Sequence, residues 1–206
     1  MLYKVKTICD KSQIERCEKF FINQYMWDSI QEPKVYGWMG YLEGQGLFAK
    51  MVCEESNPKR EFTQPKDPVC EDSAMEVFVG FAEEGKPVNN NSIYLNYEVN
   101  ANGAMYAGTG HNRNNRQFIS DEIYALSSPT AVINNDNWYM EVLIPEVLLK
   151  DMCDFEKIKV GETFYCNFYK IAECEPILHF GSYSPMTSEK PDFHVQTDFA
   201  QAIIVK

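Results

Sequence analysis

Apolar and polar residues alternate with a period of two along most of the chain, which is the pattern of β-strands with one buried face. Asn102-Gly103 lies between two such stretches and predicts a type I′ hairpin turn. Strands with turns every ~8–15 residues and few helical stretches predict an all-β fold, a single antiparallel β-sandwich domain over residues 1–206, of immunoglobulin or jelly-roll type. The predicted strands are 2–8, 47–54, 75–81, 94–100, 104–109, 138–144, 163–171 and 199–205.

Only two short helices are predicted. Ser12-Gln13-Ile14-Glu15 matches a capping box and predicts a helix over 13–22. Pro145 suits the first turn of a helix and predicts another over 146–152. No other helix is expected before residue 140, and residues 55–72 are rich in Pro, Lys, Glu and Asp, so they predict a long surface loop.

The net charge of the chain limits the kinds of binding partner that we expect. The 206 residues carry a formal net charge of −11, which argues against binding to nucleic acid or anionic membranes and favours a neutral or cationic partner. No apolar run approaches the ~20 residues of a membrane-spanning helix. The first ten residues lack the basic and apolar regions of a signal peptide, so a cytoplasmic location is expected. The seven cysteines form no C-x-x-C pair and are expected to be reduced thiols.

One predicted strand carries an unusually polar face. Along residues 94–100, the side chains of Tyr94, Asn96, Glu98 and Asn100 alternate to one side and apolar side chains to the other. Such a face is too polar for a layer of the core. Further polar residues on the neighbouring strand and on the loop after the hairpin are Asp72, Glu76, His111, Arg113 and Arg116.

This mixture of groups suits a sugar. The planar groups of Asp, Glu, Asn and Arg supply the paired donors and acceptors that hydroxyls require, and an aromatic ring suits the apolar C–H face of a pyranose. The polar face is therefore a candidate saccharide-binding surface. The alternative is that Glu76, Glu98 and Arg116 form an ion-pair network on a solvated face of the sheet.

Several short motifs carry a resemblance to a known family. They are 51–54 (MVCE), 67–73 (DPVCEDS), 94–103 (YLNYEVNANG), 110–116 (GHNRNNR), 167–170 (NFYK), 179–186 (HFGSYSPM) and 191–194 (PDFH). With these motifs, residues 20–206 resemble the family 9-like carbohydrate-binding modules, a β-sandwich group related to the sugar-binding module of some xylanases. The resemblance implies a sugar slot lined by polar strand residues and aromatic walls.

The resemblance also implies roles for individual residues. By motif position, Glu76 and Arg116 resemble the pair that grips sugar hydroxyls, and Tyr183 stands where a stacking Trp is often found. The chain departs from the family pattern at Cys70, where Trp or Tyr is usual. Further contacts, or groups that orient Arg116, are expected from Asn96, Glu98, Asn100, Arg113 and Asp72. Residues that supply the missing ring, or else belong to the core, are Trp27, Tyr25, Trp38 and Tyr36.

We therefore expect a non-catalytic carbohydrate-binding protein associated with carbohydrate catabolism, with a saccharide as ligand and a separate glycoside hydrolase as a candidate partner. One alternative is a xylanase-related glycoside hydrolase, or a fragment of one, that uses two carboxylates drawn from Asp72, Glu76 and Glu98. The other is a protein-interaction β-sandwich that has lost sugar binding. The sequence favours the reading without catalytic residues.

No cofactor is required by the sequence. The candidate metal is calcium, for which Asp67, Glu71 and Asp72 would supply oxygen ligands from one acidic loop. The alternative is a solvated acidic loop. The histidines do not pair at helical spacing, so each is expected to be a hydrogen-bonded structural residue; they are His111, His179 and His194.

Overall fold

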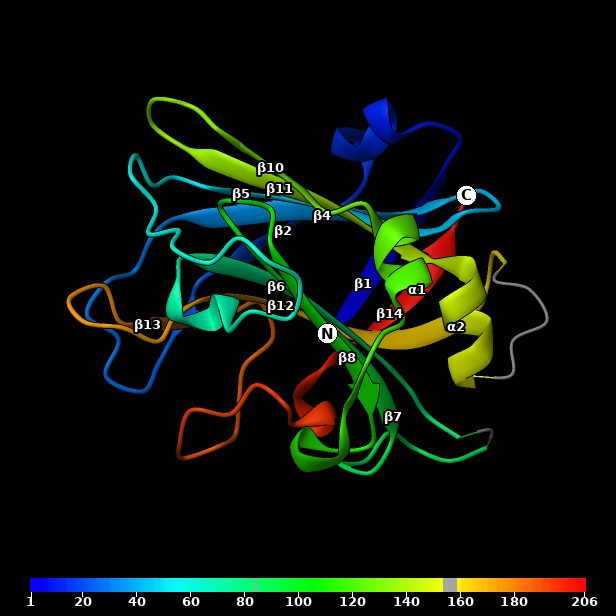
Figure 1. Ribbon diagram of the computed structural model, residues 1–206. Coiled ribbons are helices and arrows are strands. Elements are labelled where there is room, and N and C mark those ends of the chain that lie inside the picture. The colour runs from blue at the N-terminus through cyan, green and yellow to red at the C-terminus, as the bar shows by residue number, and fades with distance from the viewer. Residues whose placement is uncertain (84, 154–158) are drawn as a thin grey trace.

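The computed structural model describes residues 1–83, 85–153 and 159–206. Within these ranges, fourteen strands form one hydrogen-bonded sheet that curls into two packed layers (Figure 1). The strands are β1 (Leu2–Ile8), β2 (Lys19–Ile22), β3 (Gln24–Tyr25), β4 (Val35–Leu42), β5 (Gly46–Cys53), β6 (Ala74–Phe81), β7 (Ile93–Asn100), β8 (Met105–Gly110), β9 (Gln117–Phe118), β10 (Thr130–Ile133), β11 (Trp138–Pro145), β12 (Thr163–Ala172), β13 (His179–Ser182) and β14 (Ala200–Val205).

Two connections join the layers. Strands β10, β11, β5 and β4 form one layer, and β12, β6, β7, β8 and β9 form the other. Between them, β1 pairs in parallel with both β4 and β14, and β14 pairs with β12. Farther along the same strands, β2 pairs with β4, while β3 pairs with β13, which pairs with β12. The predicted sandwich is confirmed, but the expectation of a wholly antiparallel sheet is wrong at the two ladders of β1.

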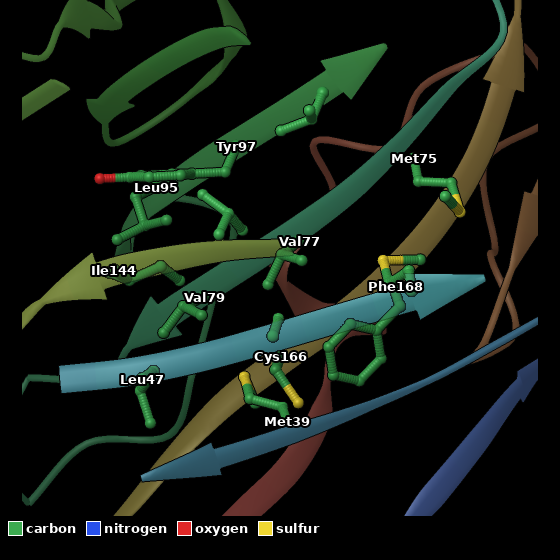
Figure 2. Close-up of a cluster of buried hydrophobic side chains, with 14 of the residues drawn as sticks. Met39, Leu47, Met75, Val77, Val79, Leu95, Tyr97, Ile144, Cys166 and Phe168 are labelled. Atoms are coloured by element: carbon green, nitrogen blue, oxygen red, sulfur yellow. The ribbon is translucent and has the colours of Figure 1, made fainter. Parts of the chain in front are cut away.

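The main core fills the space between the two layers. Figure 2 shows Met39 and Leu47 of one layer beside Val77, Leu95 and Phe168 of the other, and all five side chains are buried. The core residues of β6 and β7 are those that the period-two pattern places on a common face. Their polar neighbours, discussed below, therefore lie on the outer face of the second layer, as the sequence predicts.

The helix expected over 13–22 is wrong. A 3₁₀ helix covers Lys11–Arg16, and Asp10 caps it by accepting a hydrogen bond from the backbone N–H of Ser12 at 2.8 Å. The chain then enters β2, where buried Phe20 alternates with exposed Phe21. Pairing with β4 and burial of one strand face outweigh the weak helical spacing of the apolar residues in this segment.

The remaining helices are short. Helix α2 (Glu146–Cys153) begins directly after Pro145, as predicted. Helix α1 (Asp121–Ser127) was not predicted, although Ser120 accepts from the backbone N–H of Ile123 at 3.2 Å and acidic residues occupy the first turn. Other 3₁₀ helices are Val69–Glu71, Arg113–Asn115 and Gln196–Asp198. In the described part of the chain, every helix is too short or too polar to cross a bilayer.

The outer face of the second layer is covered by residues 183–199, which connect β13 to β14. Phe193 stacks on Tyr169 of β12, with ring centroids 4.0 Å apart, and Phe199 packs edge-on against Phe78 of β6 at 6.1 Å. Both faces of β6 are consequently buried along its whole length. Polar side chains on this outer face are thus held between a sheet and a covering loop, and they need partners there.

Prediction: Phe20→Ala should destabilise the fold by about 3–5 kcal/mol, because a fully buried ring leaves a cavity when it is truncated. Phe20 lies parallel to Phe168, with ring centroids 3.7 Å apart, across the junction of the two layers. Phe21→Ala is the matched control, since that ring is 54% exposed. Urea unfolding measures both variants, and equal losses of stability would contradict the proposed packing.

Candidate functional site

A pocket of about 160 Å³ opens on the covered face of the second layer. Its floor is formed by Glu76 of β6 and Glu98 of β7, which are direct cross-strand neighbours. Its walls come from segments that are far apart in the sequence. The lining residues are Trp27, Pro68, Cys70, Glu76, Glu98, Tyr106, Arg113, Arg116, Ile171, Glu173, Phe180, Pro191, Asp192, Phe193 and His194.

Glu76 is the most unusual group in the pocket. Its side chain is 2% exposed, yet no hydrogen bond or ion pair between described residues involves its carboxylate. Burial raises the pKa of Glu76 well above its ordinary value, and the nearby charges of Glu98 and Glu173 raise it further. Arg116 and Arg113 oppose this shift without reversing it. Glu76 is therefore an acceptor group at the pocket floor that the protein itself leaves unpaired.

Glu98 is held in a short polar network. The side-chain amide of Asn96 donates to Oε1 of Glu98 at 2.7 Å, and its carbonyl oxygen accepts from Nη1 of Arg116 at 2.8 Å. The same Nη1 lies 3.8 Å from Oε1 of Glu98. Burial raises the pKa of Glu98 to about 7, against the lowering effects of Arg116 and Asn96. Asn96 thus fixes both the carboxylate and the guanidinium that face the pocket.

Two arginines reach the pocket from the 3₁₀ turn after β8. Nε of Arg116 donates to the backbone carbonyl of Arg113 at 3.2 Å, and its guanidinium lies over the ring of Tyr106, 5.6 Å from the centroid. Arg113 lies 3.7 Å from the carboxylate of Asp192 and donates to the carbonyl of Pro191 at 3.4 Å. Arg116 is therefore positioned from three sides, and Arg113 ties the turn to the covering loop.

Aromatic residues form one wall. Trp27 lies 5.7 Å from Phe180 and 5.4 Å from Phe193 between ring centroids, and its indole N–H donates to the carbonyl of Ser188 at 2.9 Å. Trp27 has a left-handed backbone with φ of 54°, a conformation that non-glycine residues adopt rarely and usually in turns. The pocket therefore combines carboxylates, a guanidinium and apolar ring surface.

His194 contributes a neutral group to the same wall. Its Nδ1 shares a hydrogen bond with the hydroxyl of Tyr94 at 2.8 Å. Burial lowers its pKa to about 2, and the charges of Arg116 and Arg113 act in the same direction. The imidazole consequently carries no charge at neutral pH. Its role as a hydrogen-bonded residue agrees with the sequence-based expectation.

Tyr183 does not line this pocket, which corrects the stacking role expected for it. Its ring packs toward the inter-layer core, with centroids 5.9 Å from Tyr3, 5.8 Å from Phe20 and 5.7 Å from Phe168. Burial raises its pKa to about 12. The reason is strand alternation, because Phe180 and Tyr183 lie three positions apart and so point to opposite faces. Phe180 is the ring of this segment that reaches the pocket.

Asp72 and Asn100 form a separate structural cluster. Asp72 accepts from the backbone N–H groups of Glu61 and Phe62, both at 2.9 Å, and from the side-chain amide of Asn100 at 2.8 Å. The amide oxygen of Asn100 is also engaged, since it accepts from backbone N–H groups in the turn after β7. Neither residue lines the pocket. Their expected contact with a ligand is therefore corrected to a role in anchoring the 59–72 loop.

The calcium candidates Asp67, Glu71 and Asp72 are not gathered into a common cluster of ligands among the described residues. Burial acts to raise the pKa of Asp72, but hydrogen bonds from Glu61 and Phe62 lower it overall, so its carboxylate is stabilised by protein donors. Asp67 likewise accepts from the backbone N–H of Gln64 at 2.8 Å, and Glu71 is exposed. Across residues 1–83, 85–153 and 159–206, no cluster of three or more His, Cys, Asp or Glu suits a metal ion.

The other histidines are also structural. His111 Nδ1 contacts the carbonyl of Asn91 at 2.8 Å, and His179 Nδ1 contacts the carbonyl of Ile177 at 2.6 Å. Burial, followed by the charge of Lys170, lowers the pKa of His179 to about 3. Both histidines therefore fit the hydrogen-bonded role that the sequence predicts.

Sequence reasoning brought together the pocket floor but missed most of its walls. It named Glu76, Glu98, Asn96, Arg113 and Arg116, all of which the structure gathers at one place. Trp27 was considered only as one of four residues that supply the aromatic ring missing at Cys70 or else belong to the core. The pocket residues that the sequence did not indicate as contacts are Pro68, Cys70, Tyr106, Ile171, Glu173, Phe180, Pro191, Asp192, Phe193 and His194. The 191–194 motif contains four of these residues and was the signal available for them.

Comparisons with known proteins identify the family and the fold. The model of the family described as carbohydrate-binding family 9 matches residues 4–203, nearly the whole chain. No curated protein matches the chain. The family match therefore rests on the pattern of residues over the full sandwich rather than on one motif.

Solved structures share the fold. A proposed carbohydrate-binding protein from Bacteroides uniformis superposes with a TM-score of 0.82 at 20% identity, covering 99% of each chain. A family 9 carbohydrate-binding module from Caldicellulosiruptor kristjanssonii in complex with cellotriose has a TM-score of 0.66 at 10% identity, covering 99% of this chain and 93% of that one. A family 9 carbohydrate-binding module from the same organism in complex with glucose has a TM-score of 0.63 at 10% identity, covering 100% of this chain and 96% of that one.

Prediction: Glu76→Gln should gain stability relative to the unmodified protein as pH rises from about 5 to about 8. Glu76 and Glu98 both have raised pKa values in the folded protein, so each contributes stability that is complete below a pH of about 4.5 and is lost as the pH rises through its folded pKa, which is about 7 for Glu98. The substitution removes the part of that loss that belongs to Glu76, while Glu98 keeps its own. The expected gain is at least about 1 kcal/mol, because a tenfold change in a proton-binding constant corresponds to about 1.4 kcal/mol.

Urea unfolding at several pH values measures this difference. The difference between variants is the informative quantity, because the lowered pKa values of His179 and His194 make stability rise over part of the same range. Exposed Glu189→Gln is the matched control and should follow the unmodified protein. A stability difference for Glu76→Gln that stays constant with pH would contradict the raised pKa of the pair.

Prediction: Asn100→Ala should lower the free energy of unfolding by about 1–3 kcal/mol, because it leaves buried polar partners unsatisfied. The amide of Asn100 donates to Asp72 and to the carbonyl of Phe62 at 2.9 Å. Exposed Asn114→Ala, outside this cluster, is the control. Urea unfolding distinguishes them, and an unchanged midpoint for Asn100→Ala would remove the anchoring role.

Proposed function

The chain belongs to carbohydrate-binding family 9, and from this premise we propose that it binds a saccharide, without turning it over, in the pocket floored by Glu76 and Glu98. The observation that carries the proposal is the buried, unpaired carboxylate of Glu76, which lines a pocket beside a positioned guanidinium and an aromatic wall. A buried acceptor without a protein partner is costly unless something else satisfies it. A hydroxyl-rich ligand does so.

Each group has a distinct task in this proposal. Glu76 accepts hydrogen bonds from sugar hydroxyls. Arg116 donates to the sugar, because Asn96 and the carbonyl of Arg113 engage only Nη1 and Nε of its planar donor set. Trp27 and Phe180 offer apolar ring surface to the C–H face of the sugar. Asn96 is a positioning residue that acts through Arg116 and Glu98.

The size of the pocket suits a small ligand. Its volume of about 160 Å³ lies below the ~300–1,000 Å³ of sites for drug-sized molecules, so one sugar ring is the expected occupant. The similar modules from Caldicellulosiruptor kristjanssonii are complexes with glucose and cellotriose, which supports a saccharide ligand here. Association with carbohydrate catabolism and with a separate glycoside hydrolase stays a prediction.

Glycoside hydrolysis is the second candidate function, because one observation favours it. The pKa of Glu98 is raised to about 7 by burial, and a general acid in such an enzyme needs a raised pKa. The geometry favours binding instead. Glu76 and Glu98 are neighbours on one sheet face, whereas the two carboxylates of a glycosidase flank the scissile bond.

Prediction: Glu76→Ala should weaken the binding of a neutral sugar by about three- to tenfold, because a typical hydrogen bond contributes about 0.5–1.5 kcal/mol net and alanine cannot form it. Isothermal calorimetry against glucose, cellobiose, cellotriose and a panel of other sugars measures the affinity. Glu122→Ala, on an exposed residue of α1 outside the pocket, is the control. Thermal unfolding of both variants verifies that they are folded.

Three outcomes would contradict the proposal. If no sugar of the panel binds the unmodified protein, the protein-interaction reading of the fold replaces saccharide binding. If the unmodified protein releases the chromophore from aryl glycosides and Glu76→Gln does not, the pocket is catalytic. Unchanged affinity in folded Glu76→Ala would place the sugar elsewhere on the molecule.

A further inference from the structure

The charges around the pocket are unbalanced. Four carboxyl groups line it, against the guanidinium groups of Arg113 and Arg116. Both arginines are already committed, since Arg113 pairs with Asp192 and Arg116 lies near Glu98 and bonds to Asn96. The remaining carboxylates are buried Glu76, and Glu173 on the exposed rim. The pocket therefore holds more acidic than basic side chains, and Glu76 is the buried acid that no described cationic group contacts.

The other groups that face Glu76 do not correct this imbalance. The neutral imidazole of His194 carries no charge, because burial lowers its pKa to about 2. Burial and the adjacent carboxylates raise the pKa of the Cys70 thiol, so it stays protonated. The hydroxyl of Tyr94, whose pKa burial also raises, is neutral as well. Among the described groups, Glu76 has no partner of opposite charge within contact distance.

A buried carboxylate in this position has two stable states. It holds a proton, or it meets a cationic group that enters with a ligand. A neutral hydroxyl satisfies its hydrogen-bonding capacity but leaves its charge uncompensated. An amino group satisfies both the hydrogen-bonding capacity and the charge of the carboxylate. If the amine carries the proton, the two groups form an ion pair, and if the carboxyl carries it, both groups are neutral, so no unpaired charge is buried in either case. The preferred ligand group beside Glu76 is thus a primary amine.

We propose that the pocket selects sugars that carry a free amino group over the corresponding neutral sugars, with Glu76 accepting a hydrogen bond from the ammonium. This inference rests on the proposed saccharide-binding function and narrows its ligand class. Charge-assisted hydrogen bonds are roughly twice as strong as neutral ones, which gives the direction of the preference. The net charge of −11 adds a weaker, long-range attraction for cations.

The same arrangement disfavours acidic sugars. A uronic acid would bring a fifth acidic group into the pocket. Arg116 keeps N–H donors for a ligand, but its positive charge already faces Glu98 at 3.8 Å, as that of Arg113 faces Asp192 at 3.7 Å. Separating either arginine from its partner would leave another carboxylate unpaired. The expected order of affinity is therefore amino sugar, then neutral sugar, then uronic acid.

Isothermal calorimetry with the full chain tests this order, using glucosamine, glucose, N-acetylglucosamine and glucuronic acid near neutral pH. Glucosamine is expected to bind at least about tenfold more tightly than glucose. N-acetylglucosamine carries the same ring without the charge and should lose the advantage. Repeating the titration in buffers of different ionisation enthalpy should reveal proton release with glucosamine and none with glucose, because Glu76 gives up its proton when the ammonium enters.

Glu76→Gln provides the matched variant. It keeps a hydrogen-bond acceptor and removes the charge, so the ratio of glucosamine to glucose affinity should fall toward one while glucose still binds. Glu122→Gln should leave the ratio unchanged. A ratio that persists in folded Glu76→Gln would overturn the assignment to Glu76.

Failure of this inference is distinguishable from failure of the proposed function. Equal affinity of the unmodified protein for glucosamine and glucose, without proton release, would overturn the amino-sugar preference while leaving saccharide binding in place. Binding of glucuronic acid as tight as that of glucosamine would overturn it as well. Absence of binding by every sugar would overturn both.

Discussion

The arrangement of this protein depends on the burial of both faces of the central strands β6 and β7. The inner face packs into the core between the layers, and residues 183–199 cover the outer face. Every polar side chain on the outer face must therefore find a partner within the protein or within a ligand. Asn100 finds Asp72, and Asn96 finds both Glu98 and Arg116. Glu76 finds none, and the pocket opens at that position.

Placing two glutamates opposite each other on adjacent buried strands costs stability, because each carboxylate loses water and repels the other. The network of Asn96 and Arg116 offsets this cost for Glu98 alone. A folded protein under selection for stability alone would carry an apolar or amide side chain in place of Glu76. Retaining an unpaired carboxylate on a pocket floor is more easily explained by a ligand than by the fold, which links the energetics of the sheet to the proposed function.

The sequence predicted those features that depend on local alternation. The faces of β6 and β7 are confirmed, and so is a hairpin between β7 and β8. The expected type I′ turn is wrong, because Asn102 does not have a positive φ and the turn hydrogen bond runs from the N–H of Gly103 to the carbonyl of Asn100 at 2.9 Å. The convergence of Glu76 with Arg116 in one pocket agrees with the family resemblance rather than with any local pattern. It failed where distant segments decide the outcome. The parallel ladders of β1 and the replacement of the helix over 13–22 by a 3₁₀ turn and β2 follow from pairing with strands more than ten residues away. The stacking role expected for Tyr183 was wrong because the pairing of β13 with β12 decides which side chains of this segment point toward the pocket.

The walls of the pocket illustrate the limit of such prediction in physical terms. Trp27, Phe180 and Phe193 belong to three loops or strand ends, and only the covering segment and the β3–β13 ladder bring their rings within about 6 Å of one another. Residue spacing along the sequence does not predict that these three rings lie close together. The floor depends on two adjacent strands, whereas the aromatic wall depends on contacts between distant segments. Exchanging Trp27, Phe180 or Phe193 for another apolar residue would therefore change the shape of the pocket without altering its charge.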